Sequence, residues 1–115
     1  MTTSYIFTDR SALDTAVEAW ITDEAAAIET YGDINTWDVS GITDFSYLFR
    51  DKTEFNSDIG DWDVSNGTNF SKMFDSAHRF DKDIGNWDVS NGTNFKDMFR
   101  SATLFNQDIG DWDVS

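Results

Sequence analysis

The residues Trp-Asp-Val-Ser-Asn-Gly-Thr-Asn-Phe at positions 62–70 occur again, without a single change, at positions 87–95. A looser copy occupies positions 37–45. The tryptophans that open the copies are evenly spaced, at Trp37, Trp62, Trp87 and Trp112. Self-similarity at a fixed period of about 25 residues is typical of arrays in which one unit is too small to bury its apolar face alone. The sequence therefore predicts units that stack on one another.

Two apolar patterns follow each other inside a unit. Trp and Val alternate with Asp and Ser at the start, which predicts a short strand with Trp and Val facing the core. The next apolar residues have the i, i+3, i+4 spacing of a helix stripe, extended by an alanine at i+7 in two units: Phe45, Leu48, Phe49; Phe70, Met73, Phe74, Ala77; Phe95, Met98, Phe99, Ala102. A returning segment adds core residues Phe55, Phe80, Phe105, Ile59, Ile84 and Ile109. The predicted fold class is therefore α/β, built from strand-turn-helix coils.

Two places in the unit hold only glycine or asparagine. One is occupied by Gly41, Asn66 and Asn91, and the other by Gly60, Gly85 and Gly110, with Asn35 in the equivalent place before Trp37. Gly and Asn tolerate positive φ better than other residues. Both places are therefore predicted to be left-handed corners of the coil.

The first residues do not follow the repeat. Ser11 is a candidate N-cap for a helix whose apolar face is Leu13, Val17, Trp20 and Ile21. Thr22-Asp23 offers a second cap, and Gly32 is placed to end the second helix. We therefore divide the chain into an N-terminal helical cap, 1–32, and a repeat array, 33–115. The last unit stops at Ser115 without a closing cap, which predicts an exposed end able to self-associate.

Composition limits the classes of partner. The chain has 115 residues, 22 acidic and 8 basic, giving a formal charge of −14. Because no basic footprint is available to neutralise phosphates, a nucleic-acid partner is not expected. There is no cysteine, no apolar run long enough to span a bilayer, and no N-terminal pattern of a signal peptide. Cationic partners, divalent metal ions and simple solubility are all compatible with this charge.

Three strings in the third unit carry a family resemblance. They are Trp-Asp-Val-Ser at 87–90, Met-Phe-Arg-Ser-Ala at 98–102 and Phe-Asn-Gln-Asp-Ile-Gly at 105–110. The pattern resembles the surface-protein repeats of BspA-like leucine-rich proteins and of the DUF285 family. The resemblance implies a right-handed leucine-rich-repeat-like solenoid, display at the cell surface or secretion, a role in adhesion or recognition, and no enzyme activity. Gly67 and Gly92 depart from it, because the family commonly has an apolar residue there, as Ile42 is here.

A column of acidic and amide side chains is predicted on the outer side of the strands. Its members are Asp38, Asp61, Asp63, Asn86, Asp88, Asp111 and Asp113. One interpretation is that the aspartates accept backbone N–H bonds at the following turn. A second is that carboxylates from adjacent units chelate Ca²⁺, although no calcium-loop spacing accompanies them. A third is an acidic face that binds a basic partner.

These residues are our predicted partner-binding site, for a protein or a glycan. We expect no catalytic residue, metal site or cofactor, because His78 has no second His or Cys near it in sequence and no nucleophile motif is present. The predicted function is a non-enzymatic recognition or adhesion module. The alternative is a structural array that assembles by stacking end to end.

Overall fold

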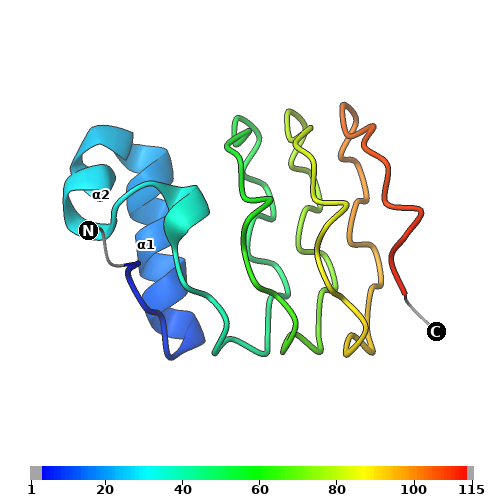
Figure 1. The fold of residues 1–115 in the computed structure, drawn as a ribbon. Coiled ribbons are helices and arrows are strands. Elements are labelled where there is room, and N and C mark those ends of the chain that lie inside the picture. The colour runs from blue at the N-terminus through cyan, green and yellow to red at the C-terminus, as the bar shows by residue number, and fades with distance from the viewer. Residues whose placement is uncertain (1–3, 114–115) are drawn as a thin grey trace.

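The computed structural model describes residues 4–113, and it begins with two helices (Figure 1). Helix α1 (Arg10–Thr22) is capped by Asp9, whose carboxylate accepts the N–H of Ala12 at 2.8 Å, so the prediction of Ser11 as the cap is wrong. Helix α2 (Glu24–Tyr31) is capped by Asp23, as predicted, and ends at Gly32 with φ of 77°. Ser115, the predicted uncapped end, lies outside the described residues.

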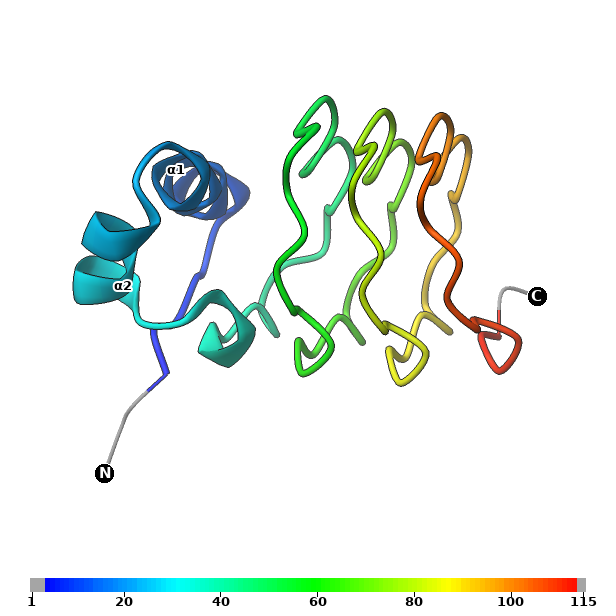
Figure 2. The ribbon, with the colours of Figure 1, turned by 90° about the horizontal axis from the view of Figure 1, so that it is seen from above.

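Helix α1 lies alongside the first unit of the array, residues 37–61. Figures 1 and 2 show the helix at the N-terminal end of the molecule. Its buried face is Leu13, Ala16, Val17 and Trp20, whereas Ile21 is exposed. The Trp20 indole donates to the Ser57 hydroxyl at 3.0 Å. The helix therefore covers apolar surface that the first unit would otherwise leave in water.

The predicted α/β class, a leucine-rich-repeat-like solenoid of strand-turn-helix coils, is wrong. Beyond α2, the described residues contain one short 3-10 helix, η1 (Ile34–Thr36), and no further helix. Backbone pairing between extended segments is limited, in residues 4–113, to three isolated parallel bridges: Ile6 with Asp38, Asp44 with Asn69, and Asn69 with Asn94. The molecule is a small compact body of 37 × 26 × 23 Å whose units consist of turns.

The predicted helix stripe does not form a helix because its N–H groups bond elsewhere. In a helix the Phe49 N–H would bond to Phe45, but it donates to Met73 of the next unit at 2.8 Å. Two residues of each unit also adopt positive φ, between 55° and 64°, which no continuous α-helix allows. They are Tyr47, Asp51, Lys72, Ser76, Asp97 and Ser101. The apolar spacing is thus satisfied by consecutive turns.

The predicted core is nevertheless buried in the first two units, and partly buried in the third, where Phe95, Phe99, Phe105 and Ile109 keep some exposure. We call residues 37–61 the first unit, 62–86 the second and 87–111 the third. Equivalent rings stack across unit boundaries, with centroids 5.5 Å apart for Phe49 and Phe74, and again for Phe74 and Phe99. The indoles of Trp62, Trp87 and Trp112 each donate to a carbonyl 28 residues earlier in the chain. Trp87 at the start of the third unit, for example, donates to the Ile59 carbonyl near the end of the first unit at 3.0 Å. Stacking buries aromatic area that one unit could not bury alone.

The left-handed corners predicted at the Gly and Asn places are also wrong. Among the described residues, Gly32 is the only glycine at positive φ, and no asparagine has it. Positions 60 and 85 need glycine because a side chain would not fit there. An added Cβ would lie 2.7 Å from a carbonyl of the next unit, that of Asp83 at Gly60 and that of Asp108 at Gly85. Asn66 contributes a hydrogen bond between units: its side-chain amide donates to the Ser40 carbonyl of the previous unit at 2.7 Å.

Gly67 and Gly92 replace the apolar Ile42 because an aromatic ring fills the space. An added Cβ on Gly67 would lie 2.6 Å from the Phe70 ring and 2.9 Å from the Phe45 ring, and one on Gly92 would meet the Phe95 ring. Both glycines are buried. They therefore leave no deficit in the core and allow close contact between units.

Candidate functional site

The aspartate column serves first as a set of turn caps. Asp38, Asp63 and Asp88 each accept two hydrogen bonds from the serine two residues later, from its N–H at 3.0 Å and from its hydroxyl at 2.5–2.6 Å. The Ser40 hydroxyl and N–H hold the pKa of Asp38 below its usual value, and Ser90 does the same for the pKa of Asp88. The turn-capping interpretation is confirmed for these three residues.

Where the array meets the cap, the column lines a polar cavity of about 470 Å³. Its walls come from the first and second units, from η1 and from the segment before Phe7. Asn35, Asp38, Asp61 and Asp63 contribute polar side chains to it, together with Ser4, Thr36 and Ser40. Asp61 and Asp63 are exposed at its edge. Three of the predicted partner-binding residues are thus brought together.

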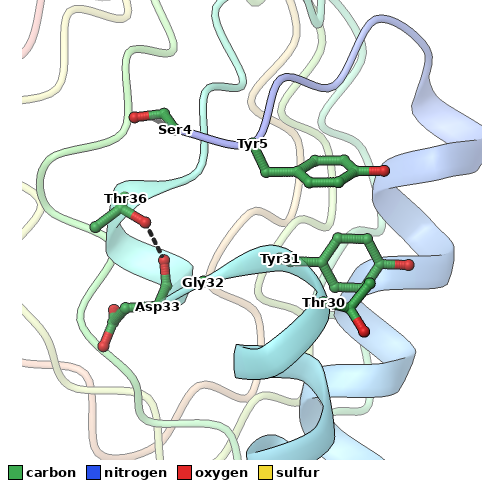
Figure 3. A pocket seen from close by; sticks show the side chains of 7 residues that line it. All are labelled: Ser4, Tyr5, Thr30, Tyr31, Gly32, Asp33 and Thr36. Carbon is green, nitrogen blue, oxygen red and sulfur yellow. Dashed lines mark hydrogen bonds between the residues drawn. The ribbon is translucent and has the colours of Figure 1, made fainter. Parts of the chain in front are cut away.

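A second cavity, of about 550 Å³, adjoins the first because both are lined by Ser4 and Thr36. Figure 3 shows the rings of Tyr5 and Tyr31 on one side of it and Asp33 and Thr36 on the other. The two rings meet edge to face with centroids 4.8 Å apart. The Thr36 hydroxyl donates to the Asp33 backbone carbonyl at 2.7 Å. We call the two adjoining cavities the cap groove.

Asn35 fixes the acidic wall of the cap groove. Its side-chain amide donates to the Asp61 carboxylate at 3.0 Å, and its side-chain oxygen accepts the Asp61 N–H at 2.9 Å. The same amide reaches Asp58 at 3.4 Å. Asp58 in turn accepts the N–H of Gly60 at 2.9 Å, so both carboxylates are held in defined positions. The groove combines ordered carboxylates, hydroxyls and an aromatic pair.

The remaining predicted site residues lie away from the cap groove. Asn86, Asp88, Asp111 and Asp113 are exposed on later units and line neither of its cavities. The acidic face therefore continues along the molecule beyond the cap groove, which lies at the junction with the cap.

Sequence reasoning missed the residues that the cap contributes to the groove. Tyr5 lies before α1, where its carbonyl accepts the Asp38 N–H at 2.8 Å. Tyr31 is the last residue of α2. Their proximity depends on the reversal of the chain between α2 and η1, and no local pattern in the sequence encodes it. The one available signal was Gly32, which marks that reversal.

Within residues 4–113, no group of three or more His, Cys, Asp or Glu side chains is placed to hold a metal ion. None of the helices described there has the length and apolarity needed to cross a bilayer. His78 is exposed, and its backbone carbonyl accepts the N–H of Leu104 at 3.2 Å.

The chain was compared with known proteins. No curated protein and no solved structure matches it. A family model described as "Mycoplasma protein of unknown function, DUF285" matches residues 24–115, which include α2 and all of the array. Because this match covers most of the sequence, the chain belongs to the DUF285 family.

Proposed function

We propose that the protein is a non-enzymatic recognition module whose cap groove binds a basic segment of a protein partner. The observation that carries the proposal is the concave surface in which Asp38, Asp61 and Asp63 adjoin two tyrosine rings. Extended polar faces on repeat-containing chains suit broad contacts with partners. Display at the cell surface, expected from the family resemblance, is part of the same proposal.

Charge supports a cationic partner. The groove carries the carboxylates of Asp33, Asp38, Asp61 and Asp63, and the residues that line it include no Lys or Arg. Capping bonds favour the ionised form of Asp38. A lysine or arginine side chain entering the groove would meet negative charge, and the exposed face of Tyr5 offers a cation–π contact of about 0.5–1 kcal/mol.

A glycan is the second candidate partner, and the tyrosine pair favours it. Tyr5 is 43% exposed, and the hydroxyl of Thr36 and the carboxylate of Asp33 lie across the same cavity from it. An apolar ring face next to hydrogen-bonding groups suits the apolar and hydroxyl faces of a sugar. The two partners differ in salt dependence, because an ion-paired peptide is weakened by salt and a neutral sugar is not.

The test uses a fluorescein-labelled peptide of alternating Lys and Ser, titrated with the full chain and followed by fluorescence anisotropy. The variant D61N/D63N removes two groove charges, and D108N/D111N removes two charges outside the groove as a matched control. Asparagine can cap such a turn in place of aspartate, since Asn69 and Asn94 accept the N–H groups of Ser71 and Lys96 at 3.0 Å where Asp44 of the first unit accepts that of Ser46.

We expect D61N/D63N to weaken peptide binding at least about fivefold and the control variant less than twofold. Equal weakening by both variants would show attraction to net charge alone and would refute the groove. Binding of neutral oligosaccharides that is insensitive to salt and is lost in Tyr5→Ala would favour the glycan instead.

End-to-end self-assembly is the alternative function, and it is supported less well. Stacking end to end needs two open ends. Helix α1 covers the N-terminal one, where Arg10 donates to the Asp44 carbonyl at 3.1 Å and Trp20 to Ser57. Self-association through the C-terminal end alone would stop at a dimer.

A further inference from the structure

The second and third units show where the fold leaves the sequence free. They have the same residue at each of their first nine positions, 62–70 and 87–95, which hold the tryptophans, the turn-capping aspartates and the buried glycines. Five of the next nine positions differ, and the pairs are Ser71 and Lys96, Lys72 and Asp97, Asp75 and Arg100, His78 and Thr103, and Arg79 and Leu104. Both units place positive φ at the same two positions, so they share one backbone path. The side chains that differ are therefore not the ones that the fold requires.

Basic residues gather in the part of the unit that differs. We call residues 46–54, 71–79 and 96–104 the divergent segments, because 46–54 is the equivalent stretch of the first unit. These segments contain six of the eight basic residues of the chain and four of its 22 acidic ones, which is a formal charge of +2. None of their residues lines the cap groove. The chain therefore has a basic region apart from its acidic one.

Three cations and a tyrosine of the divergent segments gather around one buried carboxylate. Asp75 is only 3% exposed, and its carboxylate lies 3.6 Å from the Arg50 Nε and 3.8 Å from the Arg100 Nε. The Tyr47 ring has the Arg50 guanidinium 5.5 Å from its centroid and the Lys72 ammonium 5.8 Å from it. We call Tyr47, Arg50, Lys72, Asp75 and Arg100 the arginine cluster. It draws one or two residues from each of the three units.

Asp75 holds the two arginines in place without using their hydrogen-bonding capacity. A buried carboxylate is costly unless it is paired, so its burial favours conformations in which both guanidiniums stay close. The Ser76 hydroxyl donates to the same carboxylate at 3.2 Å. At 3.6 and 3.8 Å the arginine contacts are ion pairs and not hydrogen bonds, so the guanidinium N–H groups remain available. The side chains of Arg50 and Arg100 are 48% and 61% exposed, which opens them to a ligand.

The arginine cluster suits carboxylates. The exposed Asp51 lies 3.9 Å from the Arg50 Nε, and with it included the cluster still has three cations against two carboxylates. The planar fork of a guanidinium matches a carboxylate with two parallel hydrogen bonds. Because Arg50 and Arg100 converge on one carboxylate, they are placed to meet acidic side chains at i and i+2 of an extended peptide, which are about 7 Å apart. Tyr47 is 47% exposed and adds an aromatic surface beside them.

The rest of the chain selects for a short anionic ligand. Outside the divergent segments there are 18 acidic residues and two basic ones, spread over a body 37 Å long. Charges are screened beyond about 8 Å at physiological salt, so a short acidic segment on the cluster is separated from most of these carboxylates, whereas a nucleic acid or an anionic membrane would extend over them. We propose that the arginine cluster binds a short acidic segment of a protein partner, with carboxylates at alternate positions paired to Arg50 and Arg100. This site is separate from the cap groove.

The test uses the full chain and a fluorescein-labelled peptide of alternating Glu and Ser, followed by fluorescence anisotropy. A labelled peptide of alternating Gln and Ser corrects for the charge of the dye. The variant R50Q/R100Q removes two cations of the cluster, and R79Q/K82Q removes two cations outside it and gives the same net charge. Because R50Q/R100Q leaves a buried carboxylate unpaired, R50Q/D75N/R100Q removes all three charges together and separates loss of binding from loss of folding.

We expect both arginine variants to weaken binding of the acidic peptide at least about fivefold and R79Q/K82Q less than about twofold. The groove variant D61N/D63N should not weaken it. Failure at the cluster and failure at the cap groove are therefore distinguishable, because each peptide depends on a different pair of residues.

Each other outcome overturns the proposal. Equal binding of the Glu and Gln peptides, or equal weakening by R79Q/K82Q, would show that the cluster is not a carboxylate site. A single-stranded oligonucleotide that binds more tightly than the acidic peptide, through the same arginines, would make the ligand a nucleic acid. Self-association that appears at raised concentration and is lost in R50Q/R100Q would assign the cluster to acidic residues of a second copy.

Discussion

The pair Phe74→Ala and Phe99→Ala tests whether stacking between units stabilises the fold. The Phe74 ring is fully buried, with ring neighbours in all three units: Phe49 and Phe99 at 5.5 Å and Phe80 at 4.3 Å. Phe99 is the equivalent residue of the third unit, and its ring neighbours in the described structure are Phe74 at 5.5 Å, Phe105 at 4.3 Å and Trp112 at 6.2 Å. The two positions thus differ in one stacked phenylalanine ring, the one that Phe99 supplies to Phe74.

The magnitudes follow from that difference. Truncation of a fully buried phenylalanine to alanine costs about 3–5 kcal/mol. Phe99 is partly exposed and stacks on one side only, so we expect about 2 kcal/mol there. The free energy of unfolding is measured by urea titration, with tryptophan fluorescence as the signal. Midpoints are compared between variants that have the same dependence of unfolding free energy on urea concentration, the m value.

Phe74→Leu and Phe99→Leu form a second pair with the same expected order, which keeps a folded baseline even where Phe74→Ala unfolds the chain. If the two positions cost the same free energy of unfolding in both pairs, then burial between units does not set stability, and the reasoning is refuted.

Three further predictions rest on single contacts. Gly85→Ala should lower the free energy of unfolding by about 1–3 kcal/mol, because its Cβ would lie 2.7 Å from the Asp108 carbonyl, whereas Gly110→Ala, with no following unit described, should cost less than about 0.5 kcal/mol in the same urea assay. Trp62→Phe should cost about 1–3 kcal/mol in thermal unfolding, because it leaves the Ile34 carbonyl without its indole donor at 2.7 Å; an unchanged midpoint would contradict that role. Because the pKa of Asp38 is lowered in the folded state, this carboxylate stabilises the fold above the unfolded pKa of about 3.9, and that stabilisation is lost as pH falls through the folded pKa. Ser40→Ala should therefore lose less stability between pH 7 and pH 3 than the unchanged chain does, as measured by urea unfolding at both pH values. An equal loss in the two proteins would show that the Ser40 hydroxyl does not cause the lowered pKa.

The candidate site divides into a part that the sequence could indicate and a part that it could not. Asp38, Asp61 and Asp63 recur with the period, so their shared face could be predicted by counting. Tyr5 and Tyr31 lie outside the repeat, and they meet because the segment before α1 pairs with residue 38 while the chain reverses at Gly32. Contacts between segments so far apart in sequence have no periodic signal.

By itself, the sequence determined which side chains are buried. Trp62, Val64, Phe70, Met73, Phe74, Phe80 and Ile84 are all buried in the second unit, as the pattern predicts. The family followed from the same strings of residues. Burial can be predicted in this way because apolar spacing reports which side of the chain faces away from water, whatever the backbone conformation.

Only the tertiary structure decided the backbone conformation. The i, i+3, i+4 spacing of Phe70, Met73 and Phe74 fits a helix and also fits consecutive turns. The choice was made by the neighbouring unit, whose carbonyls accept the N–H groups that a helix would use within itself. The same neighbour explains Gly60 and Gly85, where space for its carbonyl, and not positive φ, excludes a side chain. Periodicity records which residues face the core, but hydrogen bonds between units settle the path that the chain takes between them.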